Sequence, residues 1–176
     1  MANTLAAFNL QGFIEEHRDA LKPPRGSHLI FQDSQFVVMV IGGPNSRRDF
    51  HVDPSDEFFY QLEGDMVLEY IDSDGERQQA PIREGEVLMC PANVPHSPQR
   101  QPDTVGLVVQ RVRAKGEPEG FQWYCERCNS KIREVARDGD AELDLSKLIQ
   151  EYNSSVAFRT CQSCGHVHEA ATGPRV

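Results

Sequence analysis

Short hydrophobic runs alternate with turn-forming residues along most of this chain. Seven segments show the pattern of half-buried strands: 29–31, 36–41, 57–62, 66–71, 76–82, 86–89 and 105–112. Between them lie turn signals such as Asp74-Gly75 and Glu84-Gly85. Many short strands with almost no helix among them are typical of an antiparallel barrel or a double-sheet jelly roll. We therefore expect an all-β fold whose core spans residues 29–113.

Two segments outside that core have helical spacing instead. Between Asn9 and Leu21, apolar and charged residues alternate as in a short amphipathic helix that begins near Asn9. A polar linker, 114–120, then precedes the tail. One helix in the tail is indicated by apolar residues at helical spacing, namely Leu145, Leu148, Ile149 and Tyr152. We expect residues 1–113 to form the barrel with its N-terminal helix, and residues 114–176 to form a small metal-stapled tail packed on it.

Composition narrows the class of protein. At 176 residues the chain can bury one core and a small appendage, but not two full domains. Its net charge of −9 disfavours nucleic acid or an anionic membrane as a partner, because either would need a basic surface. No apolar run approaches the roughly 20 residues of a spanning helix, and the N-terminus lacks a signal-peptide pattern. We expect a cytoplasmic protein.

Three residues suggest a metal site. His51 and Glu57 fall close together where two strands should be adjacent, and a glycine turn, a strand and a proline-rich corner lead from Gly85 to His96. Two imidazoles and one carboxylate leave open positions on an octahedral Fe(II) for substrate and dioxygen. Any one of these residues taken alone would more often belong to the surface or the core. The set predicts a mononuclear Fe(II) bound by His51, Glu57 and His96.

The same residues resemble the two signature motifs of the cupin family. The first motif appears as Gly43, His51, Asp53, Glu57 and Gly64, and the second as Gly85, Pro91, Asn93 and His96. The resemblance implies a cupin fold, which is a jelly-roll β-barrel. One position departs from it, because the family often has histidine where Asp53 stands. Asp53 could serve as a fourth ligand, but we interpret it as a solvated loop acid.

Two arginines flank the predicted ligands. Arg47 precedes His51 closely, and Arg100 follows His96 at the same short spacing. A pair of guanidiniums beside a metal suits the bidentate capture of a carboxylate, although each arginine alone could be a solvated surface residue. We expect Arg47 and Arg100 to bind a small anionic substrate.

A closer resemblance covers nearly the whole chain. The segments 45–51, 57–66 and 95–100 look like those of the 3-hydroxyanthranilate 3,4-dioxygenase family. The resemblance implies Fe(II)-dependent, extradiol-type opening of 3-hydroxyanthranilate to 2-amino-3-carboxymuconate semialdehyde, the precursor of quinolinate, with both atoms of dioxygen entering the product. It further implies a small aromatic carboxylate that chelates the iron while Arg47 and Arg100 hold its carboxylate, and a homodimer.

Gln110 departs from that family. The relatives have glutamate at the matching position, where it contacts the amino and hydroxyl groups of the substrate. Glutamine can accept a hydrogen bond there, but it carries no charge and cannot take a proton. We expect Gln110 to line the pocket as a substrate-binding and catalytic residue, with a lower rate or a different substrate as the consequence. It could also be an ordinary polar residue of the barrel.

Four cysteines form the second predicted site. They make two C-x-x-C pairs, Cys125 with Cys128 and Cys161 with Cys164. Four thiolates suit a tetrahedral iron or zinc ion, and in a reducing compartment such pairs are more naturally metal ligands than disulfides. The tail resembles the rubredoxin-like site of bacterial members of the family. We expect a structural site, because ring opening consumes no external electrons, and we expect Cys90 to be buried.

Other interpretations of these residues remain open. A cupin isomerase, or a dioxygenase for a thiol acid or a gentisate-like ring, would use the same ligands, but the paired arginines and the family resemblance weigh against both. A non-catalytic cupin, acting as a binding module, is favoured by Gln110. In the tail, His166 or His168 could in principle replace a cysteine ligand.

Overall fold

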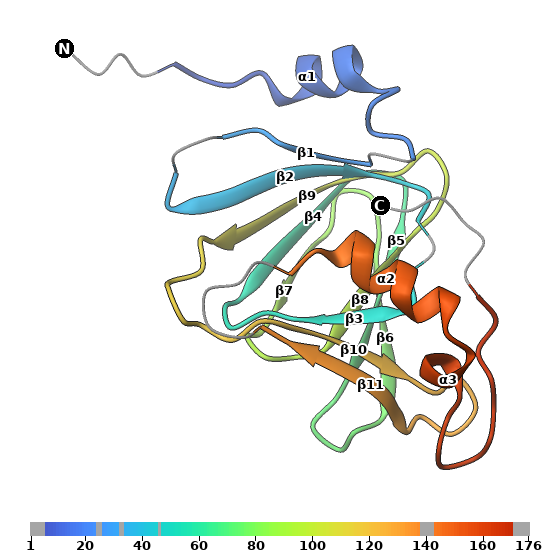
Figure 1. Cartoon of the computed structure of the whole chain (residues 1–176). Helices are drawn as coiled ribbons and strands as arrows, with labels where there is room; N and C mark the ends of the chain where they lie inside the picture. The colour runs from blue at the N-terminus through green and yellow to red at the C-terminus, as the bar shows by residue number, and fades with distance from the viewer. Residues whose placement is uncertain (1–5, 24–25, 32–33, 46, 138–142, 171–176) are drawn as a thin grey trace.

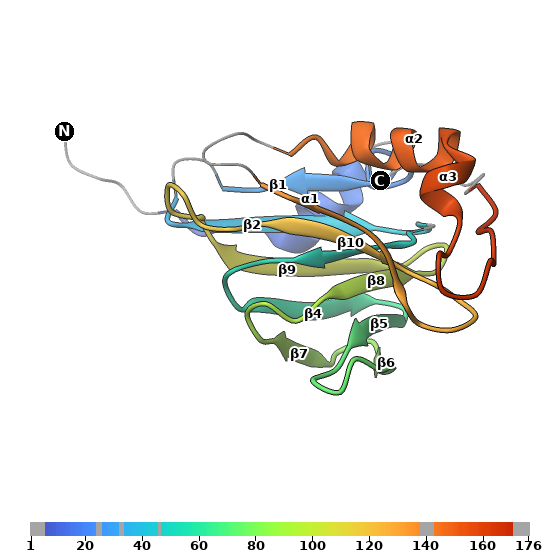
Figure 2. The same ribbon diagram turned by 60° about the horizontal axis from the view of Figure 1, so that its bottom comes forward.

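Two antiparallel sheets that face each other make up most of the molecule (Figures 1 and 2). The computed structural model describes residues 6–23, 26–31, 34–45, 47–137 and 143–170. One sheet has five strands in the order β1-β2-β9-β4-β7, and the other has six in the order β11-β10-β3-β8-β5-β6. The all-β fold class predicted from the sequence is confirmed.

The elements have the following bounds. The five-stranded sheet contains β1 (Ser27–Leu29), β2 (Phe36–Gly42), β4 (Glu57–Glu63), β7 (Val87–Cys90) and β9 (Val105–Arg111). The six-stranded sheet contains β3 (Asp49–Val52), β5 (Met66–Ile71), β6 (Arg77–Ile82), β8 (His96–Arg100), β10 (Gly120–Tyr124) and β11 (Lys131–Ala136). The helices of the described residues are α1 (Leu10–His17), α2 (Leu145–Ser154) and α3 (Val156–Arg159). None of these helices is long and apolar enough to cross a membrane.

Four of these strands do not follow from the hydrophobic pattern. β3 and β8 carry polar side chains on the face that points into the barrel, among them His96 and Arg100, so they lack the usual alternation. β10 and β11 lie beyond the linker at which the sequence ended the barrel. Because β10 pairs with β3, the six-stranded sheet continues past the boundary predicted at Arg113.

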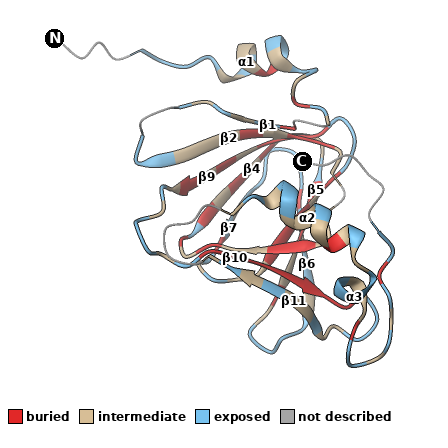
Figure 3. Cartoon of the chain, viewed as in Figure 1, coloured by how far each residue is buried: buried red, intermediate tan, exposed pale blue. Residues whose placement is uncertain are grey.

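The apolar core fills the space between the sheets, where the buried segments concentrate (Figure 3). Its main cluster consists of Phe59, Met66, Leu68, Ile82, Cys90 and Val108. Phe59 on β4 and Val108 on β9 are register partners, so their side chains enter the core side by side. Fully burying one such apolar side chain stabilises the fold by about 1.5–3 kcal/mol. Cys90 is 3% exposed, which confirms its expected burial.

Helix α1 covers part of the outer face of the five-stranded sheet. It begins after Asn9, whose side chain caps the helix by accepting a hydrogen bond from the Gly12 amide (3.0 Å). Ile14 packs with Val40 of β2 and Val105 of β9. The predicted start of the helix is confirmed, although the helix ends at His17.

Helix α2 packs against β10 and holds the tail on the barrel. The Tyr152 ring stacks on Trp123 with centroids 5.0 Å apart and an interplanar angle of 17°. Phe121 and Leu148 extend that contact. The predicted tail helix is therefore present, and the four-residue α3 follows it.

Candidate active site

The three predicted metal ligands come together inside the barrel. His51 on β3 and His96 on β8 are register partners, and Glu57 begins β4 on the opposite sheet. Glu57 Oε1 lies 3.2 Å from His51 Nδ1, and Glu57 Oε2 lies 3.0 Å from His96 Nε2. One donor atom from each residue lies within 4.8 Å of the other two. Two imidazoles and one carboxylate thus surround a single point between the sheets.

The outer nitrogen of each imidazole is already hydrogen-bonded. His96 Nδ1 donates to the carbonyl oxygen of Val94 (2.9 Å), and His51 Nε2 donates to Glu119 Oε1 (3.1 Å). In the neutral tautomer that keeps these hydrogen bonds, the ring proton is on the outer nitrogen. The inner nitrogen, which faces Glu57, then has the lone pair that a metal ion requires. The orientation of both rings is therefore compatible with a metal ion between them and Glu57.

Without a metal ion the pKa values of both imidazoles are raised above that of an ordinary histidine. Burial disfavours charge on His51, but hydrogen bonds to Glu119 and Glu57 outweigh it and raise the His51 pKa to about 9. Burial also opposes charge on His96, yet contacts with Cys90 and Glu57 raise the His96 pKa to about 9. For Glu57, burial raises the pKa, but hydrogen bonds from the two imidazoles outweigh it and hold the pKa well below its usual range. Glu57 is thus an ionised carboxylate whose negative charge the two imidazoles stabilise.

A buried ionic cluster lies behind His51, and the sequence did not reveal it. Arg113 Nη1 lies 2.6 Å from Asp53 Oδ2, and Arg113 Nη2 lies 3.0 Å from Glu119 Oε1. The amide and hydroxyl of Ser55 donate to Asp53 Oδ1 as well (2.8 and 2.5 Å). Asp53 is 1% exposed, so the interpretation as a solvated loop acid is wrong. Arg113 compensates the charge of Asp53. Glu119, which lies in the segment interpreted as a linker, holds the imidazole of His51 through a hydrogen bond.

The two predicted substrate arginines are both largely buried but differ in their partners. Arg47 donates from Nε to the buried carboxylate of Asp49 (3.2 Å to Oδ2). Arg100 is 3% exposed and donates from Nη1 to the neutral Gln61 Oε1 (3.1 Å). Within the described part of the chain, no carboxylate forms an ion pair with Arg100. Burial, and then the charge of Arg47, lower the Arg100 pKa to about 10. A buried guanidinium without an anion is a strong candidate for anion binding, because an arriving carboxylate would offset its lost hydration.

Gln110 lies on the inner face of β9. It is the register partner of Glu57 on β4, and the Gln110 side chain is 8% exposed. Together with Arg113 and Glu119 it lines a cavity of about 330 Å³. The structure thus places Gln110 beside the metal-ligand cluster and at the wall of a cavity.

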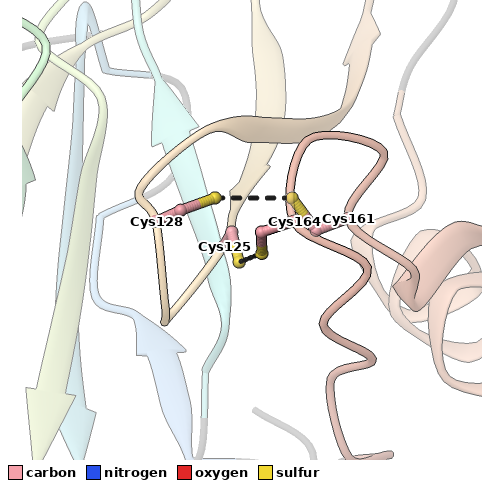
Figure 4. Close-up of side chains that lie close together, drawn as sticks. All are labelled: Cys125, Cys128, Cys161 and Cys164. Atoms are coloured by element: carbon pink, nitrogen blue, oxygen red, sulfur yellow. Dashed lines mark hydrogen bonds between the residues drawn. The ribbon is translucent and has the colours of Figure 1, made fainter.

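The four tail cysteines converge in one cluster (Figure 4). The Sγ atoms of Cys125 and Cys164 are 3.7 Å apart, and those of Cys128 and Cys161 are 3.6 Å apart. A tetrahedral site with metal–sulfur bonds of about 2.3 Å has sulfur–sulfur edges of about 3.8 Å. Disulfide-bonded sulfurs would be about 2 Å apart, and all four thiols are free. The cluster has the dimensions of a four-thiolate metal site.

His168 is committed to other contacts beside that cluster. Its Nε2 accepts a hydrogen bond from the Glu126 amide (3.1 Å), so the ring proton is on Nδ1, which lies 2.8 Å from the Tyr152 hydroxyl oxygen. Burial lowers the pKa of His168 and favours this neutral ring. Because both nitrogens have partners, His168 is a structural residue that links the segment after the second cysteine pair to the first pair and to α2.

Comparisons of the sequence with a family model and with curated relatives agree on one family. The family model described as "3-hydroxyanthranilic acid dioxygenase" matches residues 1–153. A Bacillus thuringiensis protein named "3-hydroxyanthranilate 3,4-dioxygenase" is 46% identical over 174 residues, which cover 98% of this chain and 97% of that one. A Xanthomonas oryzae protein of the same name is 47% identical over 163 residues, 92% of each chain. Among solved structures, the protein NMB1881 from Neisseria meningitidis is similar over 61% of this chain and all of that one, with 22% identity and a TM-score of 0.45.

Binding of a divalent metal ion to the metal-free barrel should release protons near neutral pH. The raised pKa values of His51 and His96, about 9, mean that protons compete with the metal below that pH. Metal affinity should therefore increase as the pH rises toward about 9 and then level off. Calorimetry in two buffers of different ionisation enthalpy measures the released protons.

The cysteine cluster also releases protons when it binds metal, so His96→Ala provides the matched control. In that variant the cysteine site still titrates while the barrel site has lost a ligand. The difference between the two proteins reports the barrel alone. An equal proton release from both would contradict the assignment of these protons to the imidazoles.

Proposed function

Because the chain belongs to the 3-hydroxyanthranilic acid dioxygenase family, we propose that it is a non-haem Fe(II) enzyme that opens the ring of 3-hydroxyanthranilate with dioxygen. The product is 2-amino-3-carboxymuconate semialdehyde, which takes up both oxygen atoms and then cyclises to quinolinate. The observation that carries the proposal is the convergence of His51, Glu57 and His96 in a barrel that also buries an uncompensated Arg100.

The donor set fits a ferrous ion. Two imidazole nitrogens and one carboxylate oxygen are a common ligand set for non-haem Fe(II), and they leave positions open for small ligands. The outer hydrogen bonds of both imidazoles already direct the free nitrogens toward Glu57. When bound, iron supplies the redox chemistry that allows dioxygen to react with an aromatic ring, and no organic cofactor is needed.

The residues of the chain bind and orient the substrate. Arg100 takes the substrate carboxylate, because its buried charge has no anionic partner among the described residues. We assign Arg47 a smaller share of this binding, since Asp49 already neutralises it. Together the two guanidiniums make the interior attractive to an aromatic acid despite the net charge of −9. Gln110, beside Glu57, offers an amide to the amino or hydroxyl group of the ring.

A second candidate function is that of a binding module with weakened or no catalysis. Gln110 favours it, because an amide can accept a hydrogen bond from the substrate hydroxyl but cannot remove its proton. The grouping of His51, Glu57 and His96 and the burial of Arg100 support the enzyme instead. We therefore prefer the enzyme.

Protein reconstituted with Fe(II) under anaerobic conditions should convert 3-hydroxyanthranilate once air is admitted. Absorbance of the muconate semialdehyde and an oxygen electrode should report one dioxygen consumed per ring opened. His96→Ala should lose barrel iron and activity together, because two ligands hold Fe(II) far less tightly than three. Substrate binding without oxygen uptake would support the binding module instead.

Replacing Gln110→Glu should raise kcat/KM for 3-hydroxyanthranilate, by up to about 10²-fold if the carboxylate acts as a base. Steady-state oxygen uptake measures the change. Gln150→Glu adds the same charge on the exposed face of α2 and should leave the rate unaltered. An unchanged rate for Gln110→Glu would mean that this position takes no part in the chemistry.

For the cysteine cluster we propose a structural iron or zinc ion. It joins the turn after β10 to the segment after α3, two parts of the tail with little apolar core between them. Five free cysteines, four of them clustered as metal ligands, favour a reducing compartment, and we propose a cytoplasmic location. Metal analysis of the protein used in the oxygen assay identifies the ion.

We also propose a homodimer, formed through the outer face of the five-stranded sheet. Val109, Phe58 and Met89 form one outward row across β9, β4 and β7, and α1 covers a different part of this sheet. Phe36 and Met89 are 53% and 56% exposed and border a cavity of about 490 Å³ on this face. An apolar surface of this kind is typical of a protein interface.

The chain should sediment as a dimer, and Met89→Glu should weaken the dimer at least about tenfold, because association would bury an unpaired charge. Val156→Glu is the control, since Val156 is 59% exposed but lies on α3. Analytical ultracentrifugation over a range of concentrations measures both. A monomeric wild-type protein would rule out the dimer.

A further inference from the structure

We propose that Gln61 and Gly106 position the guanidinium of Arg100, and that this cradle selects a carboxylated aminophenol over one without a carboxylate. The inference rests on the proposed function, because it assigns the way in which that site chooses its substrate. Neither residue is a metal ligand, and neither was singled out by a sequence motif.

The cradle lies on the sheet opposite the strand that carries Arg100. Gln61 on β4 and Gly106 on β9 are register partners on the inner face of the five-stranded sheet. Arg100 starts from β8 in the six-stranded sheet and crosses the interior to donate from Nη1 to Gln61 Oε1 (3.1 Å). Glu57 and Gln110 form a parallel row on the same inner face, with Phe59 and Val108 between the two rows. The cradle and the metal ligands therefore share one interior wall.

Gly106 provides the space for the guanidinium. A Cβ atom at this position would lie 2.6 Å from Arg100 Nη1, 2.9 Å from Gln61 Oε1 and 3.0 Å from Arg100 Nη2. Real Cβ atoms essentially never come within 3.0 Å of another atom, so a side chain at 106 would disturb the contact between Gln61 and the guanidinium. All the atoms that it would meet are ends of side chains and none belongs to the backbone, so we expect the fold to tolerate the change.

Gln61 fixes the direction of the guanidinium. Gln61 Nε2 donates to the backbone oxygen of Glu63 (3.0 Å), so Oε1 is the atom that faces Arg100. The side chain is 1% exposed, and a register irregularity between β4 and β9 occurs between Gln61 and Glu63. Two hydrogen bonds and burial thus hold the amide in a single orientation.

A neutral acceptor is essential to this arrangement. Gln61 orients Arg100 without cancelling its charge, so the full positive charge remains for an incoming anion. Arg47 shows the opposite arrangement, because its partner Asp49 is a carboxylate. The two arginines therefore differ in charge compensation: Asp49 neutralises Arg47, whereas the neutral Gln61 leaves the charge of Arg100 available to an anion.

The test uses the Fe(II)-reconstituted full chain as wild type, Gln61→Leu, Gln61→Glu and Gly106→Ala. Kinetics are measured with 3-hydroxyanthranilate and with 2-aminophenol, which lacks the carboxylate and serves as substrate or competitive inhibitor. Calorimetry gives the Kd of anthranilate, which has the carboxylate but no hydroxyl group. Gln79→Leu is the control, because it removes the same amide from an exposed glutamine on β6, whose side chain donates to Glu69 of β5.

All three cradle variants should raise KM for 3-hydroxyanthranilate, and the Kd of anthranilate, by about tenfold or more. Values for 2-aminophenol should stay within about twofold of wild type, and kcat should change less than KM. Gln61→Glu is the decisive variant. The Gln61→Glu variant retains a hydrogen-bond acceptor for Arg100, so KM and Kd would not change if position 61 had only a structural role. If the cradle selects the carboxylate, the new Glu side chain would neutralise Arg100 and weaken binding of the substrate anion.

The outcomes separate this inference from the proposed function. Ring opening by the wild type with unchanged KM and Kd in the cradle variants would overturn the cradle and leave the function intact. Equal losses for both aromatic compounds would also overturn it, because they would indicate general damage to the pocket. Cradle-dependent binding of anthranilate by a wild type that opens no ring would support the cradle and overturn the function. A wild type that binds no carboxylate would overturn both.

Discussion

The contact on which the rest of the structure depends is the one between Glu57 and the imidazoles of His51 and His96. It joins the two sheets through polar atoms at the centre of an apolar barrel. Isolated, each of these groups would be costly to bury, and together they compensate one another. Glu119 beside His51 and Cys90 beside His96, together with Glu57, raise the imidazole pKa values, and the two imidazoles lower the pKa of Glu57. A divalent cation at the same point would replace protons by a stronger positive charge.

Charge compensation then organises the surroundings of that contact. Arg113 forms ion pairs with two buried carboxylates, Asp53 and Glu119, and Glu119 in turn orients His51. The tail thereby takes part in the site, since Glu119 directly precedes β10. Arg100 is the exception, because within the described part of the chain its guanidinium has a neutral amide and no carboxylate as a partner. The interior of this acidic protein thus contains a positive charge that no described carboxylate compensates.

Much of the site could be predicted because the decisive residues lie in short, local motifs. His51 and Glu57 belong to one motif and His96 to another, and the segment between them contains the hairpin strands that the alternation predicts. Asp53, Glu119 and Gln61 could not be assigned in the same way. Asp53 seemed solvated because its partner, Arg113, is distant in sequence, and Glu119 lies in a stretch whose polarity is typical of a linker. Their roles depend on contacts between residues far apart in the chain.

By itself the sequence determined the all-β class, the capped start of α1, the four-cysteine cluster and the identity of the metal-ligand candidates. These depend on side-chain type, on local spacing and on the alternation of a strand, which act over a few residues. Only the tertiary structure decided that β10 extends the six-stranded sheet, that Asp53 is buried, and that Arg100 lacks the carboxylate partner that Arg47 has. The physical reason is that burial and charge compensation arise where strands from distant parts of the chain meet. A local sequence pattern therefore cannot predict which residue will pair with a buried charge.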